Sequence, residues 1–248
     1  MAEDGHTVLG RPTIVNRVTL TIPAFVNVQL PDGSIKLIQA YSSGFAPDGE
    51  RWVLVLDLLF NSLNLRQAVN DIMAGNFTTD ALNINMYPNT ALFSIDSTGN
   101  FAGCCVVGYH TYFYRRGVTP QPRWLFNYAT WIAPHVAPGV LFQDVTGLSH
   151  EISETLNDPF LDNLTPPWQF PGLTLCQDNL ETGDPVEVLP TITVDIALRE
   201  RHEVFHYHPQ TEALLQWFEM GATSDAIDGA FSYPDTTALT RSAVPCPQ

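Results

Sequence analysis

Two Pro-Asp-Gly turns, at residues 31–33 and 47–49, divide the first part of the chain into short segments with strand character. The segments around these turns are 13–22, 24–30, 35–42 and 51–60. The last of them is a nearly continuous apolar run, which is typical of a strand buried on both faces. The alternation of strands and tight turns predicts that the chain begins with a β-sheet.

One helix interrupts the strands of the first half. Residues 63–75 have helical spacing of their apolar side chains and end at Gly75, a residue suited to a helix C-cap. Strand-like segments then return at 81–87, 91–96, 101–114 and 123–132. We therefore expect residues 1–145 to form a mainly β-sheet lobe with one helix.

The second half of the chain has a different order of elements. The pattern predicts a helix at 145–158, an irregular proline-rich segment at 159–190, a period-two strand at 191–198 and a helix at 209–220. A loop as long as the irregular segment usually builds a functional site. We expect one α+β domain over residues 1–248, in which 146–248 is the loop-rich part.

The composition excludes several classes of partner. The chain has 248 residues, of which 45% are hydrophobic, so it can bury a sizeable core. Its formal net charge of −15 argues against binding to nucleic acid or to an anionic membrane. No apolar run reaches the roughly 18–20 residues of a membrane span, and the acidic start of the chain shows no signal peptide. We expect a soluble protein whose compartment, secretion included, stays open.

The four cysteines are Cys104, Cys105, Cys176 and Cys246. They contain no C-x-x-C pair, so a zinc site made of cysteines is not expected. Cys104 and Cys105 would point to opposite faces of a strand, so at most one of them could join Cys176 in a disulfide. Buried free thiols are the alternative, and the sequence leaves this choice open.

The most distinctive polar pattern of the chain lies in segment 145–158. On a helix with about 100° per residue, His150, Glu151, Glu154 and Asp158 fall within one narrow arc. Apolar side chains occupy the opposite side. No Lys or Arg stands three or four positions away to relieve the repulsion between the carboxylates.

Two interpretations fit this arc. In most helices with such a pattern, the acidic side is exposed to solvent. Alternatively, His150 and Glu154 bind a metal ion while Glu151 polarises a water molecule. The unrelieved acidic charge, and the acidic segment that follows the helix, favour the metal site.

A set of motifs extends from this helix into the following segment. They read S-H-E-x-x-E-x-x-N-D-P-F at 149–160, a loop that contains Trp168, and C-x-x-x-L-E-x-G-D-P at 176–185. This combination, together with 103–113, 208–218 and 229–240, resembles a group of microbial zincin-like proteins of the HExxE type. Its first element resembles, more distantly, plant phosphate-induced (EXORDIUM-type) proteins.

The resemblance implies a zincin-like fold, in which a mixed β-sheet packs on the active-site helix and its edge strand, here 108–114, borders the cleft. It also implies one zinc ion with His150 and Glu154 as ligands, Glu151 as general base, and a peptide or protein substrate. Glu181 is the expected third ligand, because a carboxylate in a loop about thirty residues past the helix is a familiar zincin arrangement. The alternatives for this third position are Asp184, Asp158 and His208.

A second string, His202-Glu203-x-x-His206, matches the better-known H-E-x-x-H zinc motif. Its context predicts a strand, because segment 191–198 runs directly into it and Pro209 leaves little room for a helix. The two imidazoles would then not share a helical face. We do not expect this string to be the catalytic motif, although a secondary metal patch is conceivable.

Other candidates are weaker. His110 is most simply a satisfied sheet histidine, with substrate contact as the alternative. No G-x-S-x-G string and no Cys/His signature indicates a serine or cysteine nucleophile. The sequence therefore predicts a zinc-dependent hydrolase, most simply a metallopeptidase, or else a non-catalytic zincin-fold binding protein with a structural metal.

Overall fold

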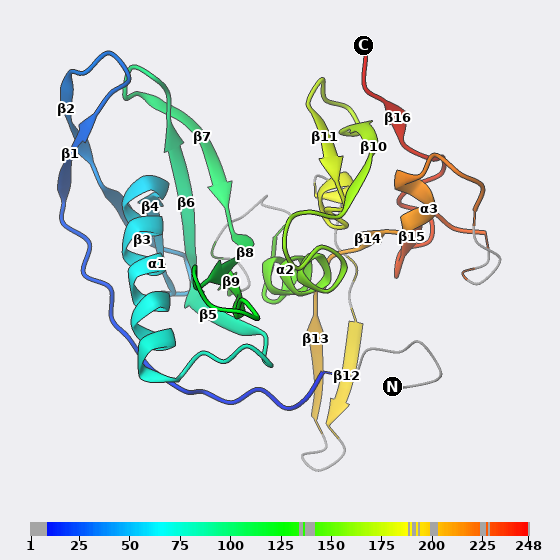
Figure 1. Ribbon diagram of the computed structural model, residues 1–248, viewed down its shortest axis with the longest axis horizontal. Helices are drawn as coiled ribbons and strands as arrows, with labels where there is room; N and C mark the ends of the chain where they lie inside the picture. The colour runs from blue at the N-terminus through cyan, green and yellow to red at the C-terminus, as the bar shows by residue number, and fades with distance from the viewer. Residues whose placement is uncertain are drawn as a thin grey trace.

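The computed structural model describes residues 9–133, 136, 142–187, 189, 192, 194–198, 203–223, 227 and 229–247. Within these ranges the fold is α+β, as expected, and consists mainly of short strands with three α-helices. In Figure 1, α2 (Thr146–Asn157) lies between the N-terminal sheets with α1 (Asp57–Ala74) and the C-terminal strands with α3 (Leu215–Phe218). No helix among these residues is long and apolar enough to cross a membrane.

The first large sheet has the strand order β3-β4-β6-β7. Its strands are β3 (Tyr41–Phe45), β4 (Arg51–Leu56), β6 (Thr90–Ile95) and β7 (Phe101–Val106). The central pair, β4 and β6, is parallel, and the two outer pairs are antiparallel. The hairpin of β1 (Phe25–Gln29) and β2 (Ile35–Gln39) forms at the first Pro-Asp-Gly turn, as the turn chemistry predicts.

The second sheet positions the candidate site. It has the order β5-β9-β8, with strands β5 (Asn83–Pro88), β9 (Arg123–Trp131) and β8 (Gly108–Tyr114). β5 runs parallel to β9 and β8 runs antiparallel to it, so the sheet is mixed. β8 is an edge strand of this sheet.

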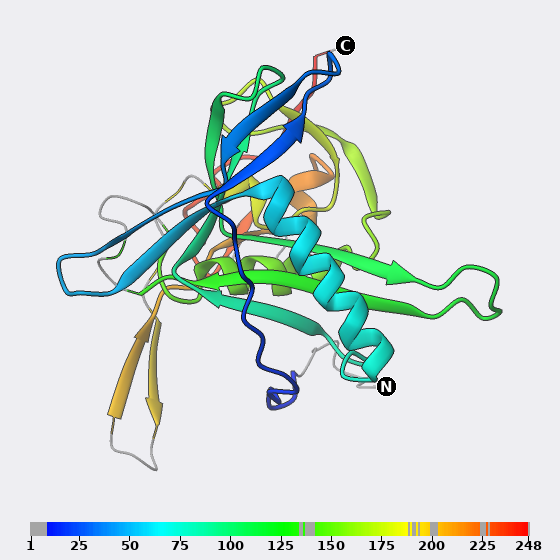
Figure 2. The same ribbon diagram turned by 90° about the vertical axis from the view of Figure 1, so that its left-hand side faces the viewer.

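The two long helices cover opposite faces of this second sheet (Figure 2). Tyr128 of β9 packs on Phe60 of α1, with ring centroids 4.8 Å apart. The next side chain, Asn127, points to the other face and donates a hydrogen bond to the carbonyl oxygen of Glu151 in α2 (3.0 Å). His110 of β8 is paired with Asn127 in the register, so its side chain also faces α2.

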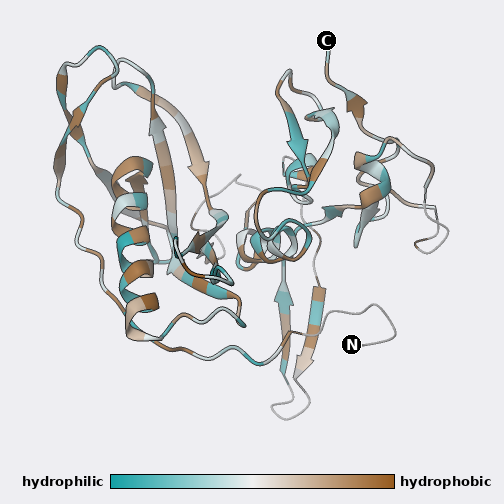
Figure 3. Ribbon diagram, viewed as in Figure 1, coloured by the Kyte–Doolittle hydropathy of each residue, from teal (hydrophilic) through white to brown (hydrophobic). Residues whose placement is uncertain are grey.

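Helix α1 begins earlier than the sequence predicts. The segment 51–60 was expected to be one strand, but the strand ends at Leu56 and the helix starts at Asp57. Residues 57–60 form the first turn of a helix whose buried side chains recur every three or four positions, at Phe60, Asn64, Ala68 and Asp71. The helix carries hydrophobic and hydrophilic bands (Figure 3) and ends at Gly75 in the left-handed conformation, as predicted.

The expected strand at 13–22 does not form. This segment is held by side chains: Asn16 Nδ2 donates to Asp71 Oδ1 of α1 (2.9 Å), and Leu20 and Ile22 pack on the cluster around Phe60. Within the described residues it has no strand partner, so its β-branched composition does not produce a ladder.

The C-terminal part contains more strands than the sequence predicts. The segment 159–190 is not wholly irregular, because it includes β10 (Leu164–Gln169), β11 (Cys176–Asn179) and the short 3₁₀-helix η1 (Asp184–Val186). β16 (Val244–Pro245) joins β10, and two hairpins follow, β12–β13 (Val194–Leu198, Glu203–Tyr207) and β14–β15 (Glu212–Ala213, Ser232–Tyr233). Trp168, Trp217 and Phe218 form the aromatic centre of this part, with the ring centroids of Trp168 and Phe218 5.5 Å apart.

The predicted helix at 209–220 is reduced to the four residues of α3. The preceding residues are extended, because Ala213 N donates to the carbonyl oxygen of Thr182 (2.7 Å) and β14 pairs with β15. This tertiary pairing outweighs the local helix propensity.

The cysteines are all paired in the described residues. Cys176 bonds to Cys246, with Cα atoms 6.0 Å apart, and Cys104 bonds to its neighbour Cys105. Neither Cys104 nor Cys105 joins Cys176, and the alternative of buried free thiols is wrong.

Replacing Cys176 and Cys246 together by Ser is expected to lower the free energy of unfolding by about 2–5 kcal/mol, because the disulfide closes a long loop of the unfolded chain. Denaturation in guanidinium chloride without reductant measures the difference. With reductant, variant and wild type should converge. An unchanged midpoint in non-reducing buffer would contradict the stabilising role of this bond.

Candidate metal centre

The acidic face of α2 is buried. Glu151 and Glu154 are 4% and 3% exposed, whereas Leu156 on the apolar side of the helix is 47% exposed. The helix thus turns its polar arc toward β8, β9 and the loop after β11. The interpretation of this arc as a solvated acidic face is therefore wrong.

Two glycines let the neighbouring segments lie directly on this face. A Cβ atom at Gly108, the first residue of β8, would overlap the carboxylate of Glu151. A Cβ atom at Gly183 would overlap the imidazole of His150. Both positions require glycine because the backbone approaches a buried ionisable group.

Gln210 determines which ring nitrogen of His150 carries a proton. The amide nitrogen of Gln210 donates to the carbonyl oxygen of Gly183 (2.6 Å), so the amide oxygen is the atom that faces His150. His150 Nδ1 lies 3.0 Å from this oxygen, which can only accept, and Nδ1 therefore carries a proton. The other ring nitrogen, Nε2, is turned toward Glu154 Oε1 (3.0 Å) and Asp184 Oδ1 (3.6 Å). This arrangement is typical of histidines that bind metals.

His110 is held in the same manner from the opposite side. Its Nε2 donates to the carbonyl oxygen of Asp158 (3.2 Å). Its Nδ1 faces the Oε2 atoms of Glu151 and Glu154, each at 3.5 Å, and Glu181 Oε2 at 3.8 Å. Burial alone would lower the pKa of His110, but the facing carboxylates outweigh burial and raise this pKa to about 10.

These side chains form two groups that could each hold a metal ion. The first group is His110, Glu154 and Glu181, and the second is His150, Glu151 and Glu154. In each group the possible ligand atoms lie within 4.8 Å of one another, and all members are buried. Nitrogen and carboxylate oxygen ligands at this spacing are compatible with a divalent cation.

The structure brings the predicted site residues close together, but Glu181 lies in a different group from His150. His150, Glu151 and Glu154 lie in one group, as the helix spacing indicates. Glu181 lies with Glu154 and His110, and not in the group of His150. Asn179 Nδ2 donates to Glu181 Oε1 and orients it.

The three alternatives for the third ligand differ in their surroundings. Only Asp184 faces His150. Asp158 caps the end of α2, where its Oδ1 accepts hydrogen bonds from the backbone of two loop residues. His208 pairs with Asp144 through Nδ1 (2.7 Å) and belongs to neither group.

Negative charge accumulates at this centre. Burial, with the nearby Glu154 carboxylate, raises the pKa of Glu181 to about 9 and that of Asp184 to about 7. Burial also raises the pKa of Glu212 to about 8. The hydroxyls of Thr182 and Ser153 near Glu212 lower its pKa, but burial outweighs them. A bound cation would relieve this accumulation.

The H-E-x-x-H string does not form a helical site. Glu203 to His206 lie on strand β13, as predicted, and His202 falls outside the described residues. His206 is exposed and pairs with Asp195 across the hairpin (2.6 Å). It belongs to neither ligand group.

Sequence reasoning missed three contributors to the centre. The sequence predicts His110 as a sheet histidine or a substrate contact, and it predicts a helix over Gln210 and Glu212. The signal for His110 was its place on an edge strand next to the predicted helix. The signal for Gln210 and Glu212 was their spacing of two, which puts both on one side of an extended segment.

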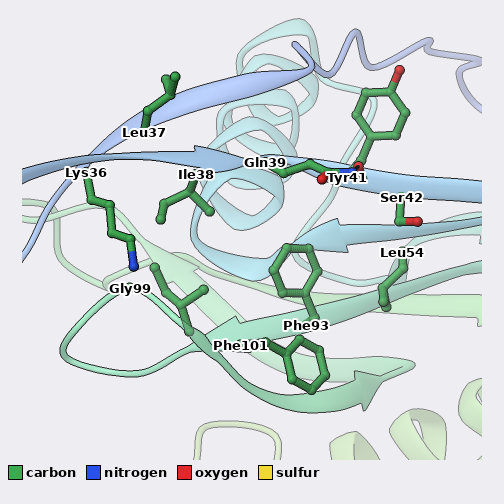
Figure 4. Close-up of a pocket in the computed structure, with 11 residues that line it drawn as sticks. Lys36, Leu37, Ile38, Gln39, Tyr41, Ser42, Leu54, Phe93, Gly99 and Phe101 are labelled. Atoms are coloured by element: carbon green, nitrogen blue, oxygen red, sulfur yellow. Dashed lines mark hydrogen bonds between the residues drawn. The ribbon is translucent and has the colours of Figure 1, made fainter.

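A cavity of about 400 Å³ lies elsewhere, between the β1–β2 hairpin and the first sheet (Figure 4). Its lining is largely apolar and includes Ile38, Leu54, Phe93 and Phe101. The amine of Lys36 at its edge already donates to Thr98 O and Asn100 Oδ1. This lining offers no group of metal-binding or nucleophilic side chains.

No family model matches the chain, and no curated protein or solved structure matches it. The resemblance to zincin-like proteins therefore stays a prediction.

Replacing Gln210 by Leu is expected to weaken zinc binding by roughly 10–100-fold, because the Nδ1 proton of His150 loses its acceptor and the ring loses its orientation. Calorimetric titration of chelator-treated protein with zinc measures the affinity. Gln29→Leu, at an exposed position of β1, is the matched control and should bind as the wild type does. Equal affinities for all three proteins would contradict the positioning role.

The chelator-treated protein should lose stability as pH rises from near 4.5 toward 9. The pKa values of Glu181, Asp184 and Glu212 are raised in the folded state. These three groups therefore contribute their full stabilisation at pH values below their pKa in the unfolded chain. This stabilisation is lost as the pH rises past their pKa in the folded protein. The raised pKa of His110 acts in the same direction. Urea denaturation across this pH range measures how the free energy of unfolding changes with pH. Saturating zinc should make this change smaller. A stability that rises with pH would contradict the raised pKa values of these carboxyl groups.

Proposed function

We propose that the chain is a zinc-dependent hydrolase and that peptides are its substrates. The observation that carries this proposal is the carboxylate of Glu151. Its Oε2 atom is buried, lies 3.5 Å from His110 Nδ1, and makes no hydrogen bond within the described part of the chain. His110 Nδ1 stands opposite this oxygen at ion-pair distance but makes no hydrogen bond to it, so a bound cation or water molecule would complete its surroundings.

The donor set fits zinc. Imidazole nitrogens and carboxylate oxygens are both ligands that zinc accepts. We assign His150 and Glu154, one helical turn apart, as protein ligands, with Glu181 from the loop after β11 in the adjoining group that shares Glu154. The position of α2 against edge strand β8 supports a zincin-like arrangement.

Zinc at this position would supply Lewis-acid polarisation of the scissile carbonyl and of the attacking water. The chain supplies the proton transfers. Glu151 accepts a proton from the water as the oxygen attacks the carbonyl carbon. It then returns the proton to the amine nitrogen as the C–N bond breaks.

The closure of the centre favours a second candidate, a binding protein with a structural metal. The side chains of His110, Glu151 and Glu154 are at most 5% exposed, and that of His150 is 12% exposed. Structural zinc sites are closed, whereas catalytic sites keep an open position for substrate.

Replacing Glu151 by Gln separates the two candidates. For a hydrolase, the variant should retain its zinc but lose about 10²–10⁴-fold in peptide hydrolysis, because the general base is gone. Metal analysis of the purified protein and cleavage of a fluorogenic peptide library measure both properties. Zinc retained without hydrolysis, in wild type and variant alike, would favour the structural metal.

Glu203→Gln is the matched control, because it changes the glutamate of the H-E-x-x-H string on the exposed strand β13. It should keep both zinc and activity. Glu154→Gln should lose zinc, since Glu154 belongs to both ligand groups. A wild-type protein that binds no zinc after chelation and resupply would overturn both candidates.

A further inference from the structure

The two carboxylate oxygens of Glu154 face different imidazoles. Oε1 lies 3.0 Å from His150 Nε2 and accepts a hydrogen bond from Gly183 N (3.1 Å). Oε2 lies 3.5 Å from His110 Nδ1. A carboxylate held in this manner can bind one cation with each oxygen and so bridge two ions.

The two histidines do not share a ligand group. His110 groups with Glu154 and Glu181, and His150 groups with Glu151 and Glu154. Glu154 is the member common to both. One ion in contact with both ring nitrogens would require these side chains to move, whereas two ions would use the ring nitrogens where they stand.

Hydrogen bonds orient both imidazoles so that each could bind a metal ion. The outer nitrogen of each ring donates to a fixed oxygen, at Gln210 for His150 and at the Asp158 backbone for His110. The inner nitrogen of each ring then faces carboxylates. Such outer hydrogen bonds set the ring orientation and increase the basicity of a metal-binding nitrogen.

The charge of the centre also suits two cations. Five carboxyl groups gather around the two imidazoles: Glu151, Glu154, Glu181, Asp184 and Glu212. None of the ion pairs in the described ranges involves Lys or Arg. Glu151 Oε2 is buried and without a hydrogen bond there, with His110 Nδ1 opposite it at 3.5 Å. Two divalent cations could each take carboxylate ligands from this group.

We propose that the centre holds two divalent cations bridged by Glu154. His110 Nδ1, Glu154 Oε2 and Glu181 bind one ion, and His150 Nε2 and Glu154 Oε1 bind the other, with Asp184 completing its shell. This inference rests on the proposed zinc function and extends it to a second ion. Paired ions of this kind lie about 3.5–4 Å apart and act together on one substrate.

The number of zinc ions per chain tests the proposal. Chelator-treated protein is titrated with zinc chloride in a calorimeter, and the bound metal is counted by elemental analysis after gel filtration. The wild type should bind two equivalents. His110→Asn should bind one, because the group around His150 remains, and Glu154→Gln should lose tight binding of both.

His206→Asn is the matched control, since His206 is an exposed histidine outside both groups, and it should keep two equivalents. X-ray absorption of the wild-type protein at the zinc edge adds a readout that needs no variant. It should show a zinc–zinc distance of about 3.5–4 Å.

The outcomes separate this inference from the proposed function. One equivalent in the wild type, without zinc–zinc scattering, overturns the second ion and leaves a single-zinc hydrolase standing. No bound zinc overturns both. Two equivalents that persist in His110→Asn would overturn the assignment of His110. If that variant does not fold, the wild-type count and the absorption spectrum still decide between one ion and two.

Discussion

The burial of carboxylates on the inner face of α2 is the constraint to which the surrounding structure is fitted. An ionised carboxylate inside a protein costs several kcal/mol unless a partner of opposite charge and hydrogen bonds compensate it. The compensation at Glu151 and Glu154 comes from His110 on one side and His150 on the other. The segments around α2 contribute His110, orient His150 through Gln210, and carry glycine at positions 108 and 183, where a Cβ atom would overlap Glu151 and His150.

Periodicity predicted part of this centre directly. The bounds of α2 and the shared arc of His150, Glu151 and Glu154 follow from helical spacing, and the structure confirms both. The same pattern could not tell which side of the helix is buried. An amphipathic helix normally packs its apolar side inward, whereas α2 buries its polar side and leaves its apolar side chains half-buried or exposed, because the polar side meets buried partners that lie far away in the sequence.

The failures of prediction share one cause. Residues 209–220 have helical propensity, but backbone pairing with Thr182 and with β15 holds the first of them extended. Residues 13–22 have strand propensity, but contacts with α1 hold them outside any sheet. In both cases partners distant in sequence decide the local conformation, and no local pattern contains that information. The roles of Gln210 and Glu212 were hidden by the first of these two errors.

The disulfide between Cys176 and Cys246 has a consequence for the chemistry of the centre. Cys176 begins β11, and Asn179 at the end of the same strand orients Glu181. The placement of this proposed ligand therefore depends on a covalent link to a segment 70 positions away in the sequence. In surroundings that keep thiols reduced, the loop would be anchored by hydrogen bonds and packing alone. If the centre binds metal as proposed, the oxidation state of the environment would change the metal affinity, because the disulfide fixes the strand that positions Glu181.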